Sequence, residues 1–209
     1  MSEQRTTWVQ PILVDRTGTH ESTVAAVAVA ATAAWLDRSP ADEVAWSTWL
    51  SGLFTKSVRR LASPRLDGAA GALGGSLVEV GTSRALALRP YRMSDLPREV
   101  ARAQVAGTDF AREPRTGAVS GPVRLLVLGS LSTGKASAQA AHALMAWAIE
   151  ADESSVRGVV AAPHRLEVSM VSAQELADAA ASGLVVIRDA GLTEVVPGTL
   201  TAVAVATGA

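Results

Sequence analysis

The chain has 209 residues, of which 48% are hydrophobic and none is cysteine, and its formal net charge is −1. This length suits one large domain or two small ones, and the lack of cysteine excludes disulfides and thiolate metal sites. The three histidines are too scattered to suggest a metal site, and the apolar run from Val24 to Leu36 is too short to span a bilayer. We therefore expect a soluble, cytoplasmic protein with no metal, no other cofactor and no membrane partner.

Basic residues are concentrated in the middle of the chain. Residues 1–53 carry 3 basic and 6 acidic side chains, residues 54–124 carry 12 and 6, and residues 125–209 carry 4 and 8, so their net charges are −3, +6 and −4. A protein that binds the phosphate backbone of a nucleic acid uses a supply of arginines of this kind. Basic residues dispersed over a solvated surface would explain the same number of positive charges at least as well. The middle segment is therefore only a candidate RNA-binding region.

The first half alternates apolar segments with Ala-rich segments, which predicts strands and helices in turn. Ser22 or Thr23 is the expected cap of the first helix, and the glycine-rich segment 63–76 is expected to be a loop. Three tryptophans are expected to anchor the helices in the core: Trp35, Trp46 and Trp49. The expected elements are strands at 9–14 and 55–61, helices at 24–37, 41–50 and 97–105, and a hairpin of strands at 77–80 and 85–88.

A segment with two prolines and two glycines, Arg112 to Pro122, is the expected linker, with a boundary near residue 118. It divides the chain into an N-terminal α/β extension, residues 1–117, and a C-terminal domain, residues 118–209. Ser172 and Glu175 form a capping box at the start of a helix. The other expected elements are strands at 123–128, 164–171, 184–188 and 199–206, a helix from Ser132 or Thr133, and a polar loop at 152–158. This order predicts an α/β fold whose second half is a small mixed sheet with flanking helices.

The two halves resemble each other at their starts. In the first half PILV is followed by a Ser-Thr cap and an Ala-rich helix containing Trp35, and in the second LLVL is followed by Ser132, Thr133 and a helix containing Trp147. The loop lengths differ. The first half is therefore a candidate degenerate copy of the second.

The helix that begins near Ser132 has an unusual first turn. Lys135 lies there, where the unpaired N–H groups and the helix dipole disfavour a cation, so we expect an anionic group nearby. Lys135, Gln139 and His142 follow at i, i+4 and i+7 and share one face of the helix. A solvated polar stripe is the alternative interpretation of this face.

The segment from Gly129 to Lys135 also fits the phosphate-binding pattern G-x-x-x-x-G-K between a strand and a helix. The next residue departs from that pattern, because Ala136 stands where a Ser or Thr hydroxyl would hold magnesium. Ser137 is rotated by about 100° from that position. A nucleotide-binding protein is therefore the less favoured alternative.

Two longer motifs carry a resemblance to a known family, STGKASAQAAHA and RDAGLTEVVPGTLT. Together they resemble the type-2 peptidyl-tRNA hydrolases, which have a G-K-x-x-A-Q-x-x-H-A helix start and a D-A-G-x-T-x-x-x-P-G-T/S segment. The resemblance covers about residues 123–209, and the stretch WLSGLFTKSVRR is similar to an N-terminal extension in a longer bacterial form. One departure is Leu192, where many members have arginine.

The resemblance implies hydrolysis of the ester that joins a peptide to the 3′ ribose of tRNA, without a metal or a covalent intermediate. It assigns catalytic roles to Lys135, Asp189, Thr193 and Thr201. It assigns substrate-binding roles to four further residues: Gly134, Gln139, His142 and Thr199. In chemical terms Asp189 could orient or deprotonate water, and Lys135 with the helix N–H groups could hold a phosphate or the developing oxyanion.

Each of these residues also has a structural explanation when it is taken alone. Asp189 suits a plain turn, Thr193 and Thr201 suit strands, and His142 suits a packed core. A tRNA-binding protein that no longer catalyses the reaction is therefore the alternative on the same fold. The expected partner is peptidyl-tRNA, and the expected state is either a monomer whose halves form a pseudo-dimer or a homodimer.

Overall fold

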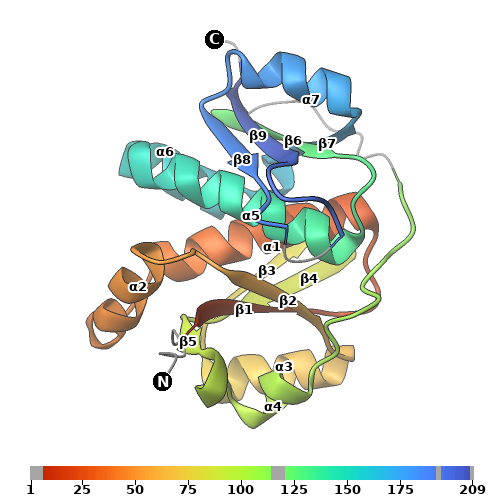
Figure 1. Cartoon of the computed structure of the whole chain (residues 1–209). Coiled ribbons are helices and arrows are strands. Elements are labelled where there is room, and N and C mark those ends of the chain that lie inside the picture. The colour runs from red at the N-terminus through yellow and green to blue at the C-terminus, as the bar shows by residue number, and fades with distance from the viewer. Residues whose placement is uncertain (1–6, 114–120, 192–193, 208–209) are drawn as a thin grey trace, which may run out of the picture.

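The computed structural model describes residues 7–113, 121–191 and 194–207 and has a mixed α/β fold (Figure 1). Its first half contains the following elements in chain order: β1 (Trp8–Val14), α1 (His20–Leu36), η1 (Pro40–Asp42), α2 (Glu43–Leu50), β2 (Lys56–Arg60), α3 (Ser63–Leu73), β3 (Ser76–Val80), β4 (Ser83–Ala87), β5 (Tyr91–Arg92), η2 (Met93–Asp95) and α4 (Arg98–Arg102). Its second half contains β6 (Val123–Leu128), α5 (Thr133–Glu150), α6 (Glu153–Ala161), η3 (Pro163–Arg165), β7 (Glu167–Val171), α7 (Ala173–Ala180), β8 (Val185–Arg188) and β9 (Leu200–Ala206).

The two halves have the same sheet topology. The first sheet has the order β2-β1-β4-β3, with β5 added at β1, and the second has the order β7-β6-β9-β8. In both sheets the first strand pairs in parallel with the second and antiparallel with the last, and the last two strands are antiparallel. The faint resemblance between the sequences of the halves therefore extends to their complete strand order.

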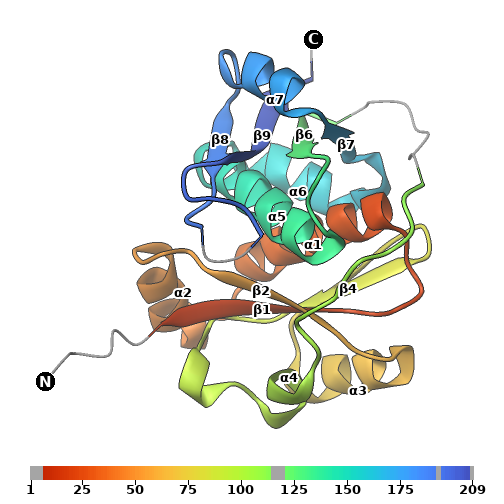
Figure 2. The same ribbon diagram turned by 45° about the vertical axis from the view of Figure 1, so that its right-hand side comes forward.

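The sheets lie on either side of a layer of helices (Figures 1 and 2). In that layer α1 packs on β3 and β4, and α5 packs on β6, β8 and β9 and also contacts β2. The outer face of the first sheet is covered by α3 and α4, and that of the second by α7 (Figure 2). The side chains of His20 and Thr133 join the starts of α1 and α5, with His20 Nδ1 lying 2.9 Å from Thr133 Oγ1.

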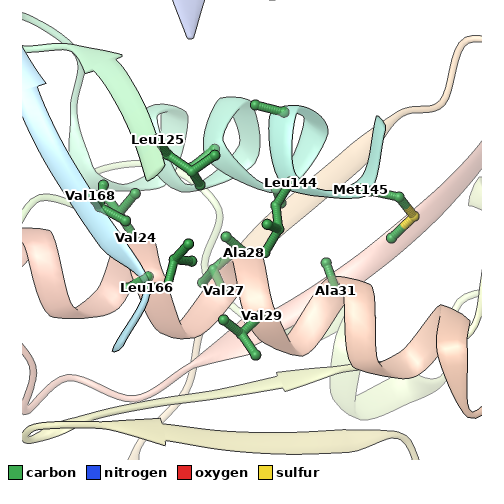
Figure 3. Close-up of a cluster of buried hydrophobic side chains, with 14 of the residues drawn as sticks. Val24, Val27, Ala28, Val29, Ala31, Leu125, Leu144, Met145, Leu166 and Val168 are labelled. Carbon is green, nitrogen blue, oxygen red and sulfur yellow. The ribbon is translucent and has the colours of Figure 1, made fainter. Parts of the chain in front are cut away.

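One hydrophobic core joins both halves. Every residue from Val24 to Ala31 of α1 is fully buried, because this helix is apolar on all sides and is covered by both the first sheet and α5. Figure 3 shows Val24 and Ala28 of α1 in the same cluster as Leu125 of β6 and Leu144 of α5. The two halves therefore stabilise each other through α1 and α5.

Several sequence predictions are confirmed. Strands β1, β2, β6, β8 and β9, the β3-β4 hairpin and helix α2 lie within about two residues of their expected bounds. The Ser172–Glu175 capping box is present, and Ser132 caps α5 through a hydrogen bond from the Lys135 N–H. Trp46 and Trp49 are buried, whereas Trp35 is only partly buried, beneath the guanidinium of Arg38.

Two segments expected to be loops are helices. Residues 63–73 form α3, because Pro64 suits a first turn and Leu66 and Ala69 provide a buried face one turn apart. Residues 153–161 form α6, which Asp152 caps by accepting a hydrogen bond from the Ser155 N–H. The high glycine and polar content of these segments concealed a short apolar face in each.

Other differences concern boundaries. Helix α1 begins at His20 with Thr19 as its cap, not at Val24 after Ser22 or Thr23. The expected helix at 97–105 is confined to Arg98–Arg102, and the strand expected from residue 164 starts at Glu167 after a 3-10 turn. The expected domain boundary near residue 118 lies outside the described residues.

Candidate functional site

The two resemblance motifs meet at a buried ion pair. Lys135 Nζ lies 2.5 Å from Asp189 Oδ2, and the two side chains are 11% and 6% exposed. Gln139, one turn after Lys135 on α5, donates a hydrogen bond of 2.8 Å to the same oxygen through Nε2. Thr201 at the start of β9 donates to Gln139 Oε1 at 2.8 Å. The structure therefore brings Lys135, Gln139, Asp189 and Thr201 into one hydrogen-bonded network.

The position of Asp189 is fixed by the backbone at the end of β8. Its N–H donates to the Thr199 carbonyl at 2.9 Å, and its own carbonyl accepts from the Gly198 N–H at 2.8 Å. The Gly191 N–H donates to Oδ1 at 2.7 Å, so both carboxylate oxygens accept hydrogen bonds. Asp189 is thus held rigidly with its carboxylate towards α5.

The pKa of the Asp189 carboxyl is lowered. Burial alone raises this pKa, but the hydrogen bond and the charge of Lys135, together with the donors of Gly191 and Gln139, outweigh that effect. Asp189 is therefore ionised at neutral pH. A carboxylate with a low pKa and three donors is a weak proton acceptor, and this geometry suits it to fixing the Lys135 ammonium.

The expected anion at the start of α5 is supplied by the protein itself. Both carboxylate oxygens of Glu194 accept hydrogen bonds from Ser132, one from its N–H at 3.0 Å and one from its hydroxyl. Asp189 lies next to Lys135 as well. Two carboxylates therefore compensate the cation and the helix dipole in this turn.

Six of the seven N–H groups from Gly129 to Lys135, those of residues 129 and 131–135, have acceptors within the protein. Glu194 and Asp109 accept from Ser132 and Thr133. The other pairs are Gly129 with Val171 O, Leu131 with Leu128 O, Gly134 with Thr108 O, and Lys135 with Ser132 Oγ. Because a phosphate-binding loop needs these donors free, this geometry does not favour nucleotide binding, and it leaves the side chain of Lys135 rather than the helix N–H groups to hold an anion.

The Lys135–Asp189 pair opens on a pocket of about 660 Å³ between the two halves. The first half contributes residues 53–58 before and within β2 and residues 105–108 after α4. The second half contributes one face of α5, which includes Gly134, Lys135, Gln139 and His142, together with residues 186–190 and Glu194. This volume lies in the range of small-molecule binding sites.

Lys56 is a pocket residue that the sequence analysis did not single out. It begins β2 and is 8% exposed, and its Nζ lies 3.3 Å from Nδ1 of His142 on α5. The rings of Phe54 and Trp49 face the same nitrogen, at 3.6 and 4.6 Å from their centroids. Burial places the pKa of Lys56 well below its usual value. The pKa of His142 is also well below its usual value, first through burial and then through the charges of Lys56 and Lys135.

The sequence does contain a signal for Lys56. Of the 19 basic residues in the chain 17 are arginines, and the only two lysines are Lys56 and Lys135. Both lysines line the same pocket. Lysine changes its pKa readily when it is buried, whereas arginine stays charged, so the placement of both lysines at one pocket is the signal that the sequence offers.

The remaining predicted site residues have other positions. Thr201 is fully buried and acts on Gln139, so it positions the network without reaching the pocket surface. The Thr199 hydroxyl donates to the Val196 carbonyl at 2.8 Å, and Thr199 does not line the pocket. Thr193 lies outside the described residues, as does Leu192.

The equivalent position in the first half is uncharged. Ser22 lies in the first turn of α1, as Lys135 lies in the first turn of α5. Gly81 directly follows β3, as Asp189 directly follows β8. A Cβ atom on Gly81 would lie 3.4 Å from Ser22 Oγ, so these two positions face each other. The first half therefore preserves the geometry of the site without its ion pair.

The arginines of the middle segment do not form one surface. Arg59 is buried and donates to the Val100 carbonyl, and Arg115 lies outside the described residues. Three others make ion pairs: Arg84 with Asp67 and Glu79, Arg89 with Asp42, and Arg124 with Glu167. A second pocket, of about 580 Å³ between α3 and α4, is lined by Arg65, Arg98 and Arg102. These three exposed arginines gather at one place, together with the carboxylate of Glu99.

Across the described residues, every helix is too short or too polar to cross a membrane. The same residues contain no group of three or more His, Asp or Glu side chains suited to a metal ion. Comparison of this chain with models of protein families, with curated proteins and with solved structures finds no match.

Proposed function

We propose that the protein hydrolyses the ester between a peptide, or an N-blocked aminoacyl group, and the 3′ ribose of tRNA in the cytoplasm. The observation that carries this proposal is the Lys135–Asp189 ion pair at a pocket shared by both halves. The resemblance of the two motifs to type-2 peptidyl-tRNA hydrolases supports it, because those motifs supply both partners of the pair.

The network suits an ester whose carbonyl oxygen gains negative charge as water attacks. The Lys135 ammonium is fixed by Asp189 and is the cation available for that oxygen, an effect worth about 10²–10³ in rate for one such donor. Gln139 and Thr201 hold Asp189 in place. The pocket has room for an aminoacyl group and part of the terminal adenosine.

The body of the tRNA would contact the first half. Strand β2 starts at the pocket with Lys56 and ends at Arg60, next to Leu61 in the arginine-lined pocket between α3 and α4. The positive charge offered to phosphates there comes from Arg65, Arg98 and Arg102. Leu61 in that pocket is five strand residues, or roughly 17 Å, from Lys56 at the site. The acidic charge of the second half would then not oppose binding.

The test is release of the acyl group from N-acetyl-aminoacyl-tRNA by the purified protein. We expect turnover by the wild type and a loss of at least about 100-fold in Asp189→Asn and in Lys135→Met. Gln174→Ala changes an exposed residue in the first turn of α7, away from the pocket, and is the matched control. Equal turnover by all four proteins would contradict the proposal.

The same preparation separates the alternatives. A tRNA-binding protein without catalysis would retain the tRNA in a binding assay and release nothing from it. The N–H groups of residues 129 and 131–135 are occupied, so we expect no magnesium-dependent binding of ATP or GTP. Nucleotide binding that Lys135→Met abolishes would favour the phosphate-loop alternative.

A further inference from the structure

Among the residues that the structure describes, two carboxylates line the pocket, and neither is a free proton acceptor. Asp189 accepts from Lys135, Gln139 and Gly191. Glu194 accepts from the N–H and the hydroxyl of Ser132. Hydrolysis by water needs a group that takes a proton while the water attacks. That group must therefore come from elsewhere in the pocket.

Lys56 meets this requirement by its position. It is the first residue of β2, it lines the pocket, and its Nζ lies 3.3 Å from Nδ1 of His142. The groups in contact with it are His142 from α5 and the uncharged rings of Trp49 and Phe54. Lys135 is the other cation whose charge acts on His142. Within the described residues no carboxylate forms an ion pair with Lys56, so nothing of opposite charge retains its proton.

The surroundings of Lys56 also favour a neutral amine, which is the form that a base requires. Burial lowers the pKa of Lys56 well below its usual value. The rings of Phe54 and Trp49 act in the opposite direction, because an aromatic face stabilises an ammonium group. In the tautomer protonated at Nε2, His142 Nδ1 accepts an N–H from the neutral Lys56 amine. The amine lone pair then remains available.

We propose that Lys56, contributed by the first half of the chain, is the catalytic base of the pocket, with His142 as its positioning residue. This inference rests on the proposed ester hydrolysis and adds to it a residue outside the two motifs. It also gives the N-terminal half a chemical role, because the site is incomplete without β2.

In the proposed reaction, the water oxygen bonds to the acyl carbon while one of the water protons passes to Lys56 Nζ. The carbonyl electron pair moves to the carbonyl oxygen, which lies beside Lys135. Collapse of this intermediate breaks the bond to the ribose 3′-oxygen, which takes the proton from the Lys56 ammonium. The products are free tRNA and a carboxylic acid that loses its proton to solvent, and Lys56 is neutral again.

The first arm of the test measures the amine directly. The chain has only two lysines, so protein labelled with ¹³C-lysine gives two Cε signals, and Lys56→Met identifies which one belongs to Lys56. We expect the Lys56 signal to titrate well below the ordinary lysine value of about 10.4, because the amine is buried. Titration of Lys56 at the ordinary value would overturn the inference, whatever the activity.

The second arm measures kcat and KM for N-acetyl-aminoacyl-tRNA across pH. Because the base must be neutral, the wild-type kcat/KM should rise with pH through the pKa of Lys56. Lys56→Met should lower kcat by about 10²–10⁴ with little change in KM, and it should abolish this rising limb. Lys56→Arg keeps a positive charge that does not titrate in this range, and it should not restore activity.

The outcomes distinguish this inference from the proposed function. A wild-type protein that releases nothing overturns both. Turnover that persists unchanged in Lys56→Met, or that Lys56→Arg restores, overturns the role of Lys56 and leaves the proposed function standing. If Lys56→Met does not fold, judged against Gln174→Ala by thermal unfolding, Lys135→Met assigns the two lysine signals. The wild-type titration and the Lys56→Arg rates then decide.

Discussion

At the scale of single residues, the site depends on side chains that are almost completely buried. Thr201 is fully buried and Gln139 is 5% exposed, yet together they hold Asp189 against Lys135. Asp189 acts here as an anchor for the cation. Its full set of hydrogen bonds and its lowered pKa make it a weak proton acceptor, so the proposed hydrolysis requires a second group in that role.

Thr201→Val should weaken the network without removing any charge. Valine matches threonine in shape but leaves Gln139 Oε1 without its donor in a buried position, which costs about 1–3 kcal/mol. We expect a lower free energy of unfolding by that amount and slower hydrolysis. Thr201→Ser retains the hydroxyl and is the matched control, so equal losses in both variants would contradict this role.

Ionisation of Asp189 should also make the free energy of unfolding depend on pH. Its pKa in the folded protein lies below the unfolded value, so its contribution is present above the unfolded pKa and is lost as pH falls through the folded one. We expect the difference in free energy of unfolding between the wild type and Asp189→Asn to be constant from about pH 7 to about pH 5 and to shrink below about pH 4. Urea unfolding at several pH values measures it. A difference that persists unchanged at about pH 2 would exclude this linkage.

At the scale of elements, the helices that the sequence did not predict are the informative ones. Glycine and polar residues dominate α3 and α6, and each helix is short and half exposed. Their apolar faces, such as Leu66 with Ala69, make sense only when a sheet is present to cover them. Helix α5 and the strands were predictable because their apolar patterns are long enough to identify the element alone.

Helix α3 can be tested through its glycines. Gly68 lies inside the helix with open space around its Cα, so Gly68→Ala should raise the free energy of unfolding by about 0.5–1 kcal/mol. Gly74 follows the helix with a φ of 68°, a conformation that alanine rarely adopts, so Gly74→Ala should lower stability. Thermal unfolding of both variants measures the contrast. Destabilisation by Gly68→Ala would show that the segment is not helical in solution.

The site was predictable only in part, and for a physical reason. The spacing of Lys135, Gln139 and His142 on one helix face follows from helix geometry, and the DAG turn placed Asp189 at the end of a strand. Lys56 and Glu194 became site residues through contacts between segments far apart in the chain. Such contacts depend on how the two sheets pack together. The periodicity of apolar residues within one segment does not predict that packing.

At the scale of the whole molecule, two halves of equal topology form one core. Helix α1 has no exposed apolar face left after it packs on both the first sheet and α5. The pocket lies where the halves meet, so the arrangement of two similar units is what brings Lys56 next to His142. In the first half Ser22 and Gly81 take the positions that Lys135 and Asp189 take in the second, without their charges.

Shared burial predicts that the halves unfold together. Leu144 on α5 is fully buried in the cluster that contains α1 (Figure 3), and Leu144→Ala should lower the free energy of unfolding by about 2–5 kcal/mol. Hydrogen exchange followed by mass spectrometry should show the same loss of protection in β1 and in β6. Faster exchange confined to β6 and its neighbours would show that the halves are independent.

The most direct test of the central claim is a double-mutant cycle at the ion pair, read as acyl release from N-acetyl-aminoacyl-tRNA. Lys135→Met and Asp189→Asn should each slow release by at least about 100-fold, and the double variant should be little slower than either one, because the two groups act as a unit. Losses that multiply in the double variant, or wild-type rates in either single variant, would contradict the claim that this pair forms the catalytic centre.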